Sequence, residues 1–232
     1  MDLVEYLKAA LYILQGTGYT AALILGAMSL GFAIGLPIAS LEIYGPRWIA
    51  RILSLYVWFF RGIPILVLLF LVYFGIYSAI ERIAMAHFGL RLELSPFSAS
   101  LVALGLASGA YQSQIFRGAI LSLPRGQFLA ATALGFTARQ AVFRVVIPQA
   151  LRISIPAWSN EYSILLKDSA VAYMLGTLEI MARTKFMAAY TYKHIPFYVF
   201  AGLLYFTLTW LGVKGLKALE RRTRIPGLGH EF

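Results

Sequence analysis

The chain has 232 residues, of which 60% are hydrophobic, 15% aromatic and only 13% charged. Soluble domains average about 45–50% apolar and about 25% charged residues, so this composition excludes a water-soluble globular protein and predicts one transmembrane domain over 1–232. The net charge of +10 requires no nucleic-acid partner, because the cytoplasmic loops of membrane proteins collect Lys and Arg.

The first predicted element is a short amphipathic helix over residues 1–14. Its apolar residues recur at helical spacing with charges between them, which is typical of a helix lying in the membrane interface. The alternative is a cytoplasmic amphipathic helix. Asp2 and Glu5 near the start, with Lys8 as the single cation, do not fit a secretory signal, so no cleavage is expected.

Five segments are long and apolar enough to span a bilayer, which takes about 20 residues for about 30 Å of hydrocarbon. They cover approximately residues 18–41, 52–80, 97–120, 155–175 and 196–216. Pro64 inside the second segment predicts that its helix bends or restarts there. We therefore predict an all-α integral membrane protein with five transmembrane helices.

The distribution of cations predicts the orientation of these spans. An odd number of spans puts the two ends on opposite sides, and most of the 20 Lys and Arg residues share one side if the C-terminus is inside. Because cytoplasmic loops are enriched in Lys and Arg, we expect the N-terminus outside and the C-terminus inside. The N-terminal helix then lies on the outer face, and the long loop 121–152 lies in the cytoplasm.

This loop carries the most specific motif of the chain. Its residues are Leu129-Ala130-Ala131, then Gly135 after three residues, then Val145-Val146-Ile147-Pro148 after nine more. They resemble the loop motif of bacterial ABC importer permeases, which runs Glu-Ala-Ala, three residues, Gly, nine residues, Ile-x-Leu-Pro. Leu129 stands where the motif has glutamate, so that position offers no polar contact, while the small residues and the spacing are retained.

Other segments resemble the polar amino acid permeases within that family. The matching motifs are Arg61-Gly62-Ile63-Pro64-Ile65, Gly109-Ala110-Tyr111, Ile115-Phe116-Arg117-Gly118 and Leu166-Lys167-Asp168-Ser169-Ala170. The resemblance covers about residues 15–224. It implies a type I ABC importer permease, a multi-pass protein of a bacterial or archaeal plasma (inner) membrane.

The resemblance also implies the role and the partners of the chain. It would form the translocation path for a polar amino acid delivered by an extracytoplasmic binding protein. Its partners would be two ATP-binding cassette subunits, a second permease that is either another copy or a close paralogue, and membrane lipid. The sequence has no Gly-x-x-x-x-Gly-Lys-Ser/Thr phosphate loop, so ATP is expected to be bound and hydrolysed by the partner subunits, and no cofactor or catalytic residue is predicted in this chain.

In this family the cytoplasmic loop forms a coupling helix that docks into the ATPase. The resemblance implies that role for six loop residues: Gln127, Ala130, Ala131, Gly135, Phe136 and Pro148. Small residues allow a helix to approach a groove on another protein closely, and Pro148 is expected to end the helix before the next span begins. The alternative is an interfacial amphipathic helix with no docking role.

Polar residues within the spans need partners or a wet cavity, because an ionised group at the centre of a membrane helix costs about 2.5–3.5 kcal/mol. One interpretation is that they line the translocation path and contact the zwitterionic substrate. The candidates are Tyr111, Gln114, Asn160, Glu161, Lys167, Asp168 and, at the cytoplasmic end, Arg61. The other interpretation is that the ionic groups of the fourth span join helices as buried pairs. An amide at Gln114, where a carboxylate would attract a cationic side chain, favours acidic or neutral polar amino acids.

Two other classes of protein were weighed. An ion-coupled secondary transporter typically shows inverted repeats, and five spans do not divide evenly. An integral membrane enzyme would use Glu161, Lys167 or Asp168 as acid and base, yet the sequence shows no nucleophile, base and orienting group at a recognisable spacing. With no cysteine and three scattered histidines, no metal site is predicted.

Overall fold

The computed structural model describes residues 3–91 and 95–225, which are mostly helical. In chain order the elements are α1 (Leu3–Tyr44), α2 (Arg47–Gly62), α3 (Ile65–Phe70), η1 (Leu71–Tyr77), α4 (Ser78–Phe88), α5 (Pro96–Ser122), α6 (Arg125–Ala133), α7 (Ala138–Ala141), η2 (Val142–Val146), α8 (Ile147–Ser169), η3 (Ala170–Leu175), α9 (Ile180–Thr191) and α10 (His194–Thr223). The predicted all-α class is therefore confirmed.

Three helical stretches of the described residues are long and apolar enough to cross a membrane: Val4–Tyr44, Ile65–Phe88 and His194–Thr223. Two further helices, α5 with 27 residues and α8 with 23, are long enough but bury Ser and Gln or Glu side chains along their length. These polar side chains lower the hydropathy of α5 and α8, and they are buried where the two helices pack at the centre of the bundle. The five-span topology and its orientation stay predictions.

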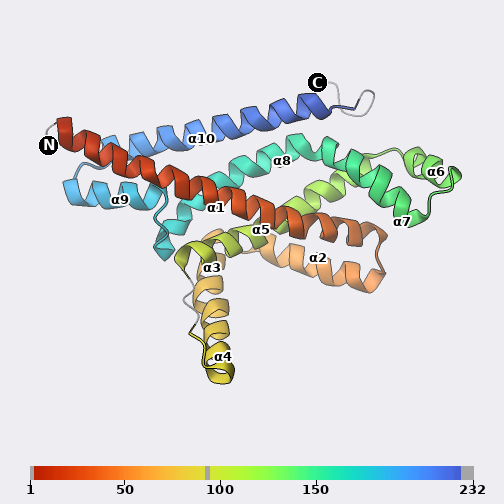
Figure 1. Cartoon of the computed structure of the whole chain (residues 1–232), viewed down its shortest axis with the longest axis horizontal. Coiled ribbons are helices and arrows are strands. Elements are labelled where there is room, and N and C mark those ends of the chain that lie inside the picture. The colour runs from red at the N-terminus through yellow and green to blue at the C-terminus, as the bar shows by residue number, and fades with distance from the viewer. Residues whose placement is uncertain (1–2, 92–94, 226–232) are drawn as a thin grey trace.

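The centre of the bundle is formed by α1, α5 and α8 (Figure 1). Leu23 and Ile24 of α1 pack with Leu104 of α5 and with Leu165 of α8. The two helices α1 and α5 approach very closely at Gly35, where an added Cβ would lie 2.9 Å from the carbonyl oxygen of Gly109. Small residues at such a crossing allow backbones to come together, which is how helices pack in membranes.

The N-terminal segment was predicted as a separate interfacial helix, and this is wrong. Residues from Leu3 onward belong to α1, which continues without interruption to Tyr44. Ala9 and Ile13 are buried against Ile180 of α9 and Phe197 of α10, so packing against distant segments holds the N-terminal turns in line with the rest of the helix. At 1.5 Å per residue, α1 is about 63 Å long, roughly twice the thickness of the hydrocarbon layer.

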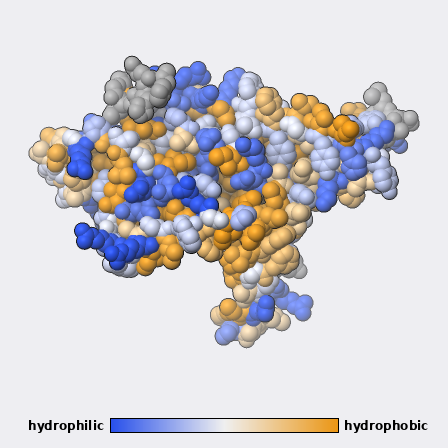
Figure 2. Space-filling view, turned by 180° about the vertical axis from the view of Figure 1, so that it is seen from behind, coloured by the Kyte–Doolittle hydropathy of each residue, from blue (hydrophilic) through white to orange (hydrophobic). Residues whose placement is uncertain are grey.

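The predicted break in the second span is confirmed. Helix α2 ends at Gly62, Ile63 has an extended backbone with ψ of 133°, and α3 begins after Pro64. The two halves then diverge: α2 lies alongside the end of α1, while α3, η1 and α4 project from the body as an arm (Figure 1). Figure 2 shows a broad hydrophobic surface where this arm joins the body.

The segment between α5 and α8 contains two short helices joined by a tight turn. Gly135 adopts φ of +87° between α6 and α7, a backbone region that glycine enters without steric cost. Helix α7 begins with a capping box, in which Thr137 and Gln140 bond each other's backbone amides at 3.3 and 3.0 Å.

Pro148 does not end the loop helix, so that expectation is wrong. The chain runs from α7 through the π-helical η2 directly into α8, with Pro148 in the first turn of α8. The wider turns of a π-helix accommodate the missing amide of a proline without breaking the helix.

The fourth span and the connection after it also differ from expectation. Helix α8 begins at Ile147, earlier than the predicted start of the span, and its last turns tighten into the 3₁₀ segment η3 before Gly176. The next segment is the additional helix α9, which lies between the fourth and fifth predicted spans and was not expected.

Candidate functional site

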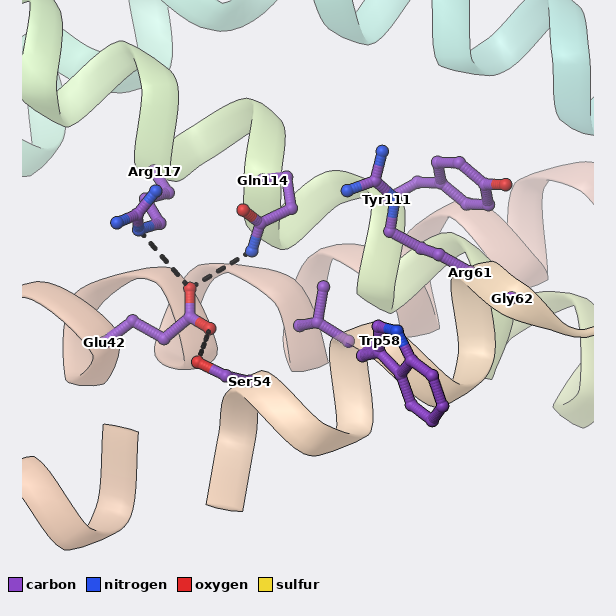
Figure 3. Close-up of a pocket in the computed structure, with 9 residues that line it drawn as sticks. Glu42, Ser54, Trp58, Arg61, Gly62, Tyr111, Gln114 and Arg117 are labelled. Carbon is purple, nitrogen blue, oxygen red and sulfur yellow. Dashed lines mark hydrogen bonds and ion pairs between the residues drawn. The ribbon is translucent and has the colours of Figure 1, made fainter. Parts of the chain in front are cut away.

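A pocket of about 610 Å³ lies between α1, α2 and α5 (Figure 3). Helix α1 contributes Glu42 and α5 contributes Tyr111, Gln114 and Arg117. The remaining lining residues come from α2: Ser54, Val57, Trp58, Arg61 and Gly62. The break at Pro64 shapes the pocket, because it ends α2 beside the middle of α5.

Glu42 is the most constrained polar group of the pocket. Its Oε2 accepts a hydrogen bond from Nε2 of Gln114 at 3.1 Å and lies 3.7 Å from Nε of Arg117, while its Oε1 accepts from the Ser54 hydroxyl at 3.1 Å. The Glu42 side chain is only 6% exposed. A buried carboxylate is stable only when partners replace its water, and here two hydrogen-bond donors and the guanidinium of Arg117 do so.

The other end of the pocket holds a cation on an aromatic ring. The guanidinium carbon of Arg61 lies 5.1 Å from the ring centroid of Tyr111. Guanidinium groups are attracted to the electron-rich face of such rings at this range. The pocket therefore presents a positive group at one end and a compensated carboxylate at the other, as Figure 3 shows.

Glu161 lies in a separate buried network between α5 and α8. Its Oε1 accepts from the Ser108 hydroxyl at 2.8 Å, and its side chain is buried. Gln112 extends the network: its Nε2 donates to the Met28 carbonyl at 3.1 Å and to Ser108 at 3.0 Å, and its Oε1 accepts from Nε1 of Trp158 at 2.7 Å. These bonds connect α1, α5 and α8 at the centre of the bundle.

The structure brings together three of the seven predicted path residues. Arg61, Tyr111 and Gln114 line the pocket, while the four from α8 do not. Of those four, Glu161 is buried, Asp168 is half-buried, and Asn160 and Lys167 are exposed. Within the described residues of this single chain, no ion pair joins the ionic groups of α8 to one another.

Glu42 and Gln112 are the polar residues that the sequence analysis missed. Glu42 directly follows the predicted end of the first span at residue 41, so it was not among the polar residues expected within the spans. The argument from Gln114 against a cationic substrate loses its premise, because a carboxylate lies in the same pocket. The sequence did contain a weak signal for Glu42, because an acidic residue next to an apolar span needs a polar or charged partner.

The loop residues fall into an exposed and an inward set. Ala130 and Gly135 are exposed, whereas Ala131 is buried and Gln127 bonds Gln149 of α8 at 3.3 Å. Phe136 and Pro148 are half-buried. Two large apolar residues that were not predicted as contacts are strongly exposed here: Leu129 and, at 81%, Leu134.

A second polar cluster ties α9 to the bundle. Glu179 is buried and caps α9, because its carboxylate accepts from the amides of Met181 at 2.8 Å and Ala182 at 2.6 Å and from the Tyr205 hydroxyl. Burial raises the pKa of the Glu179 carboxyl, and the three hydrogen bonds offset only part of this effect. Arg183 is also buried, donating to the Tyr12 carbonyl at 3.3 Å.

Comparisons with known proteins agree with this architecture. Residues 31–225 match the family described as "Binding-protein-dependent transport system inner membrane component". The chain is 31% identical to the histidine/lysine/arginine/ornithine transport system permease protein HisQ of Escherichia coli, over 90% of this chain and 92% of that one. It is 30% identical to the arginine ABC transporter permease protein ArtQ of Haemophilus influenzae, over 88% of this chain and 89% of the relative.

Solved structures give the same result. The fold is similar to a chain of an amino acid ABC transporter crystallised with histidines, with a TM-score of 0.79 and 31% identity over 96% of this chain and 99% of that chain. It is also similar to a chain of the MetNI methionine ABC transporter, with a TM-score of 0.77 over 97% of this chain and 100% of that chain. At 21% identity, the latter supports the fold alone.

Proposed function

Because the chain belongs to the family of binding-protein-dependent transport system inner membrane components, we propose how it works as the permease subunit of an amino acid ABC importer. The chain is a multi-pass inner membrane protein, and its role is that of a transport subunit rather than an enzyme. In the proposed arrangement two ATP-binding cassette subunits bind and hydrolyse ATP, and an extracytoplasmic binding protein delivers the amino acid. A second permease, either another copy or a paralogue, completes the path.

The pocket between α1, α2 and α5 is the proposed part of the path in this subunit. The observation that carries this proposal is that Arg61, Tyr111 and Gln114, each singled out by sequence, line one cavity. Arg61 has a guanidinium available for the α-carboxylate of the substrate, a pairing that is both charge-assisted and bidentate. Tyr111 and Gln114 orient the amino acid beside it.

A basic amino acid is the proposed substrate class. The two relatives described above carry the names of histidine, lysine, arginine and ornithine transport. Glu42 supplies the pocket carboxylate that Gln114 lacks, and a cationic side chain approaching it would replace one of its present donors. This proposal replaces the expectation, based on Gln114 alone, that the substrate is an acidic or neutral polar amino acid.

The segment from α6 to α7 is the proposed docking element for the ATPase. Leu129 and Leu134 present apolar surface on it, and Ala130 and Gly135 keep the backbone accessible. Because α7 continues through η2 into α8, movement of the docked segment passes to a helix at the centre of the bundle. The Gln112–Ser108–Glu161 network then connects that helix to α5 and α1.

Reconstitution tests the proposal. Uptake of radiolabelled arginine, histidine, glutamine and glutamate is measured in proteoliposomes that contain the permease, the ATPase subunits and the binding protein. We expect uptake only when ATP and all subunits are present, with basic amino acids preferred. Uptake driven by a proton or sodium gradient without ATP would contradict the permease assignment, and a preference for glutamate would contradict the substrate class alone.

A further inference from the structure

The C-terminal half of α10 carries a groove of about 490 Å³ that plays no part in the proposed path. Its apolar lining includes Phe206 and Trp210, and its charged lining consists of Lys214, Lys217, Arg221 and Glu220. Residues 206, 210, 214, 217 and 221 follow one another at spacings of three or four, so they form one stripe along the helix. The stripe changes from apolar to basic in the direction of the C-terminus.

The dimensions of this stripe match the boundary of a bilayer. From Trp210 to Arg221 the helix rises about 16 Å at 1.5 Å per residue. Each headgroup layer occupies about 5–8 Å beyond the hydrocarbon core. Tryptophan is enriched at that boundary, so the stripe passes from acyl chains at Phe206 to headgroups at Lys217 and Arg221.

The side chains of the stripe are available to a ligand. Phe206 is 69% exposed and Trp210 is 51% exposed, and the three basic residues are exposed as well. Lys214 lies with its Nζ 4.7 Å from the centroid of the Trp210 ring, so its charge is held over the apolar part of the groove. Among the residues that the structure describes, none of these three cations lies within ion-pair distance of a carboxylate.

We propose that this groove binds an anionic phospholipid, with the phosphate at Lys214, Lys217 and Arg221 and an acyl chain along Phe206 and Trp210. Basic clusters just beyond a transmembrane helix attract anionic lipids, and Lys and Arg are the side chains that bind phosphate. The charge is complementary, because three cations face one carboxylate in the groove. Membrane orientation alone would explain a basic helix end, but it would not place these cations on the same stripe as Trp210.

The cations that do not line the groove provide a matched control. Arg222 and Arg224 lie in the same short segment but outside the groove. If these cations served only to orient the helix by the positive-inside effect, removing the groove cations or Arg222 and Arg224 would have the same effect on lipid preference. If the groove is a lipid site, removing the cations that line it must reduce the preference for anionic lipid more.

Quenching of tryptophan fluorescence by brominated lipid tests the proposal. The full chain is placed in nanodiscs of phosphatidylcholine with increasing brominated phosphatidylglycerol, and the signal of the Trp210→Phe variant is subtracted to isolate Trp210. We expect brominated phosphatidylglycerol to quench Trp210 at a several-fold lower lipid fraction than brominated phosphatidylcholine does. The double substitution Lys217→Gln/Arg221→Gln should remove this preference, while Arg222→Gln/Arg224→Gln should keep it.

Three outcomes would overturn the proposal. Equal quenching by the two lipids would mean that the groove is an ordinary lipid-facing surface. An equal loss of preference in the two double variants would mean a diffuse attraction of the helix end. A Trp210 that neither lipid quenches would mean that another protein segment covers the groove. The single variant Lys217→Gln, compared with Arg222→Gln, repeats the test with a smaller perturbation of folding.

Discussion

Arg61 at the end of α2 lies over the ring of Tyr111 in α5, with its guanidinium carbon 5.1 Å from the ring centroid. The contact joins a helix end created by Pro64 to the middle of the most buried helix of the bundle. It fixes a cation in the pocket without neutralising it, so Arg61 stays available to an anionic group of a substrate.

Substitution of Arg61 by alanine is expected to lower ATP-dependent uptake by raising KM. A hydrogen bond to a charged group contributes about 1.5–3 kcal/mol, which corresponds to roughly a 10- to 100-fold loss. Arg61→Lys should recover part of the loss, because it keeps the charge but not the planar guanidinium. Arg51→Ala serves as the control on the exposed part of the same helix. Equal uptake by the Arg61 and Arg51 variants would remove Arg61 from the path.

Loss of Glu42 should destabilise the chain more than loss of its partner Arg117. Glu42→Ala removes the acceptor of two hydrogen bonds, including that of the half-buried Gln114 amide, and breaks the ion pair, which is expected to lower the free energy of unfolding by about 1–3 kcal/mol. Arg117 has a side chain 45% exposed, so solvent screens its contribution, and Arg117→Ala should cost less than about 1 kcal/mol. Denaturant unfolding in detergent gives both values. A larger effect for Arg117 would contradict this view of the pocket.

The close crossing of α1 and α5 predicts different outcomes for two glycines of the same helix. At Gly35 an added methyl group would meet backbone atoms of Gly109 and Ser113 at 2.9 Å, and at Gly18 it would meet nothing within 4 Å. Gly35→Ala should therefore cost about 1–3 kcal/mol by overpacking. Gly18→Ala should be neutral or stabilising by up to about 1 kcal/mol, since alanine favours helix. Thermal unfolding midpoints of the two variants in the same detergent compare these effects.

The exposed apolar surface between α5 and α8 predicts where the ATPase docks. Leu134→Glu should abolish co-purification of the ATPase subunit while leaving the unfolding midpoint of the permease unchanged, because Leu134 is exposed and supports no internal packing. Ile195→Glu is the control, since Ile195 is equally exposed and lies in the first turn of α10, outside the segment from α6 to α7. If the ATPase binds the Leu134 variant as well as it binds the control, the docking role belongs elsewhere.

Glu179 predicts a pH dependence of stability. Burial raises the pKa of its carboxyl in the folded state above the ordinary value of 4.5. The fold therefore favours the protonated form, so this contribution to stability is full below about pH 4.5 and is lost as the pH rises through the raised pKa. Unfolding midpoints measured against pH should show a decline above pH 4.5 that is smaller in Glu179→Gln. Parallel profiles for the two proteins would contradict the raised pKa.

Features that depend on local chemistry could be predicted from the sequence. The restart at Pro64 follows from the missing amide of one residue, and the all-α membrane class follows from composition. The pocket residues Arg61, Tyr111 and Gln114 could be selected because polar groups within apolar segments require an explanation.

Features that depend on contacts between distant parts of the chain could not be predicted from the sequence. The continuity of α1 rests on Ala9 and Ile13 packing against residues of α9 and α10. Glu42 gains its significance from partners on α2 and α5, and the buried state of Arg183 depends on a carbonyl of α1. No spacing in the sequence reports such pairings. The prediction that Pro148 ends the loop helix was wrong for a different reason. Proline usually ends a helix, but here a π-helical turn accommodates it.

The uninterrupted helix from Ala138 to Ser169 also has a mechanical consequence. At 1.5 Å per residue its contour is about 48 Å long, it contains Pro156, and it changes direction between α7 and α8 (Figure 1). A helix broken at Pro148 would leave α7 and α8 as separate bodies, whereas the helical backbone that continues through η2 passes a displacement of α7 directly to α8.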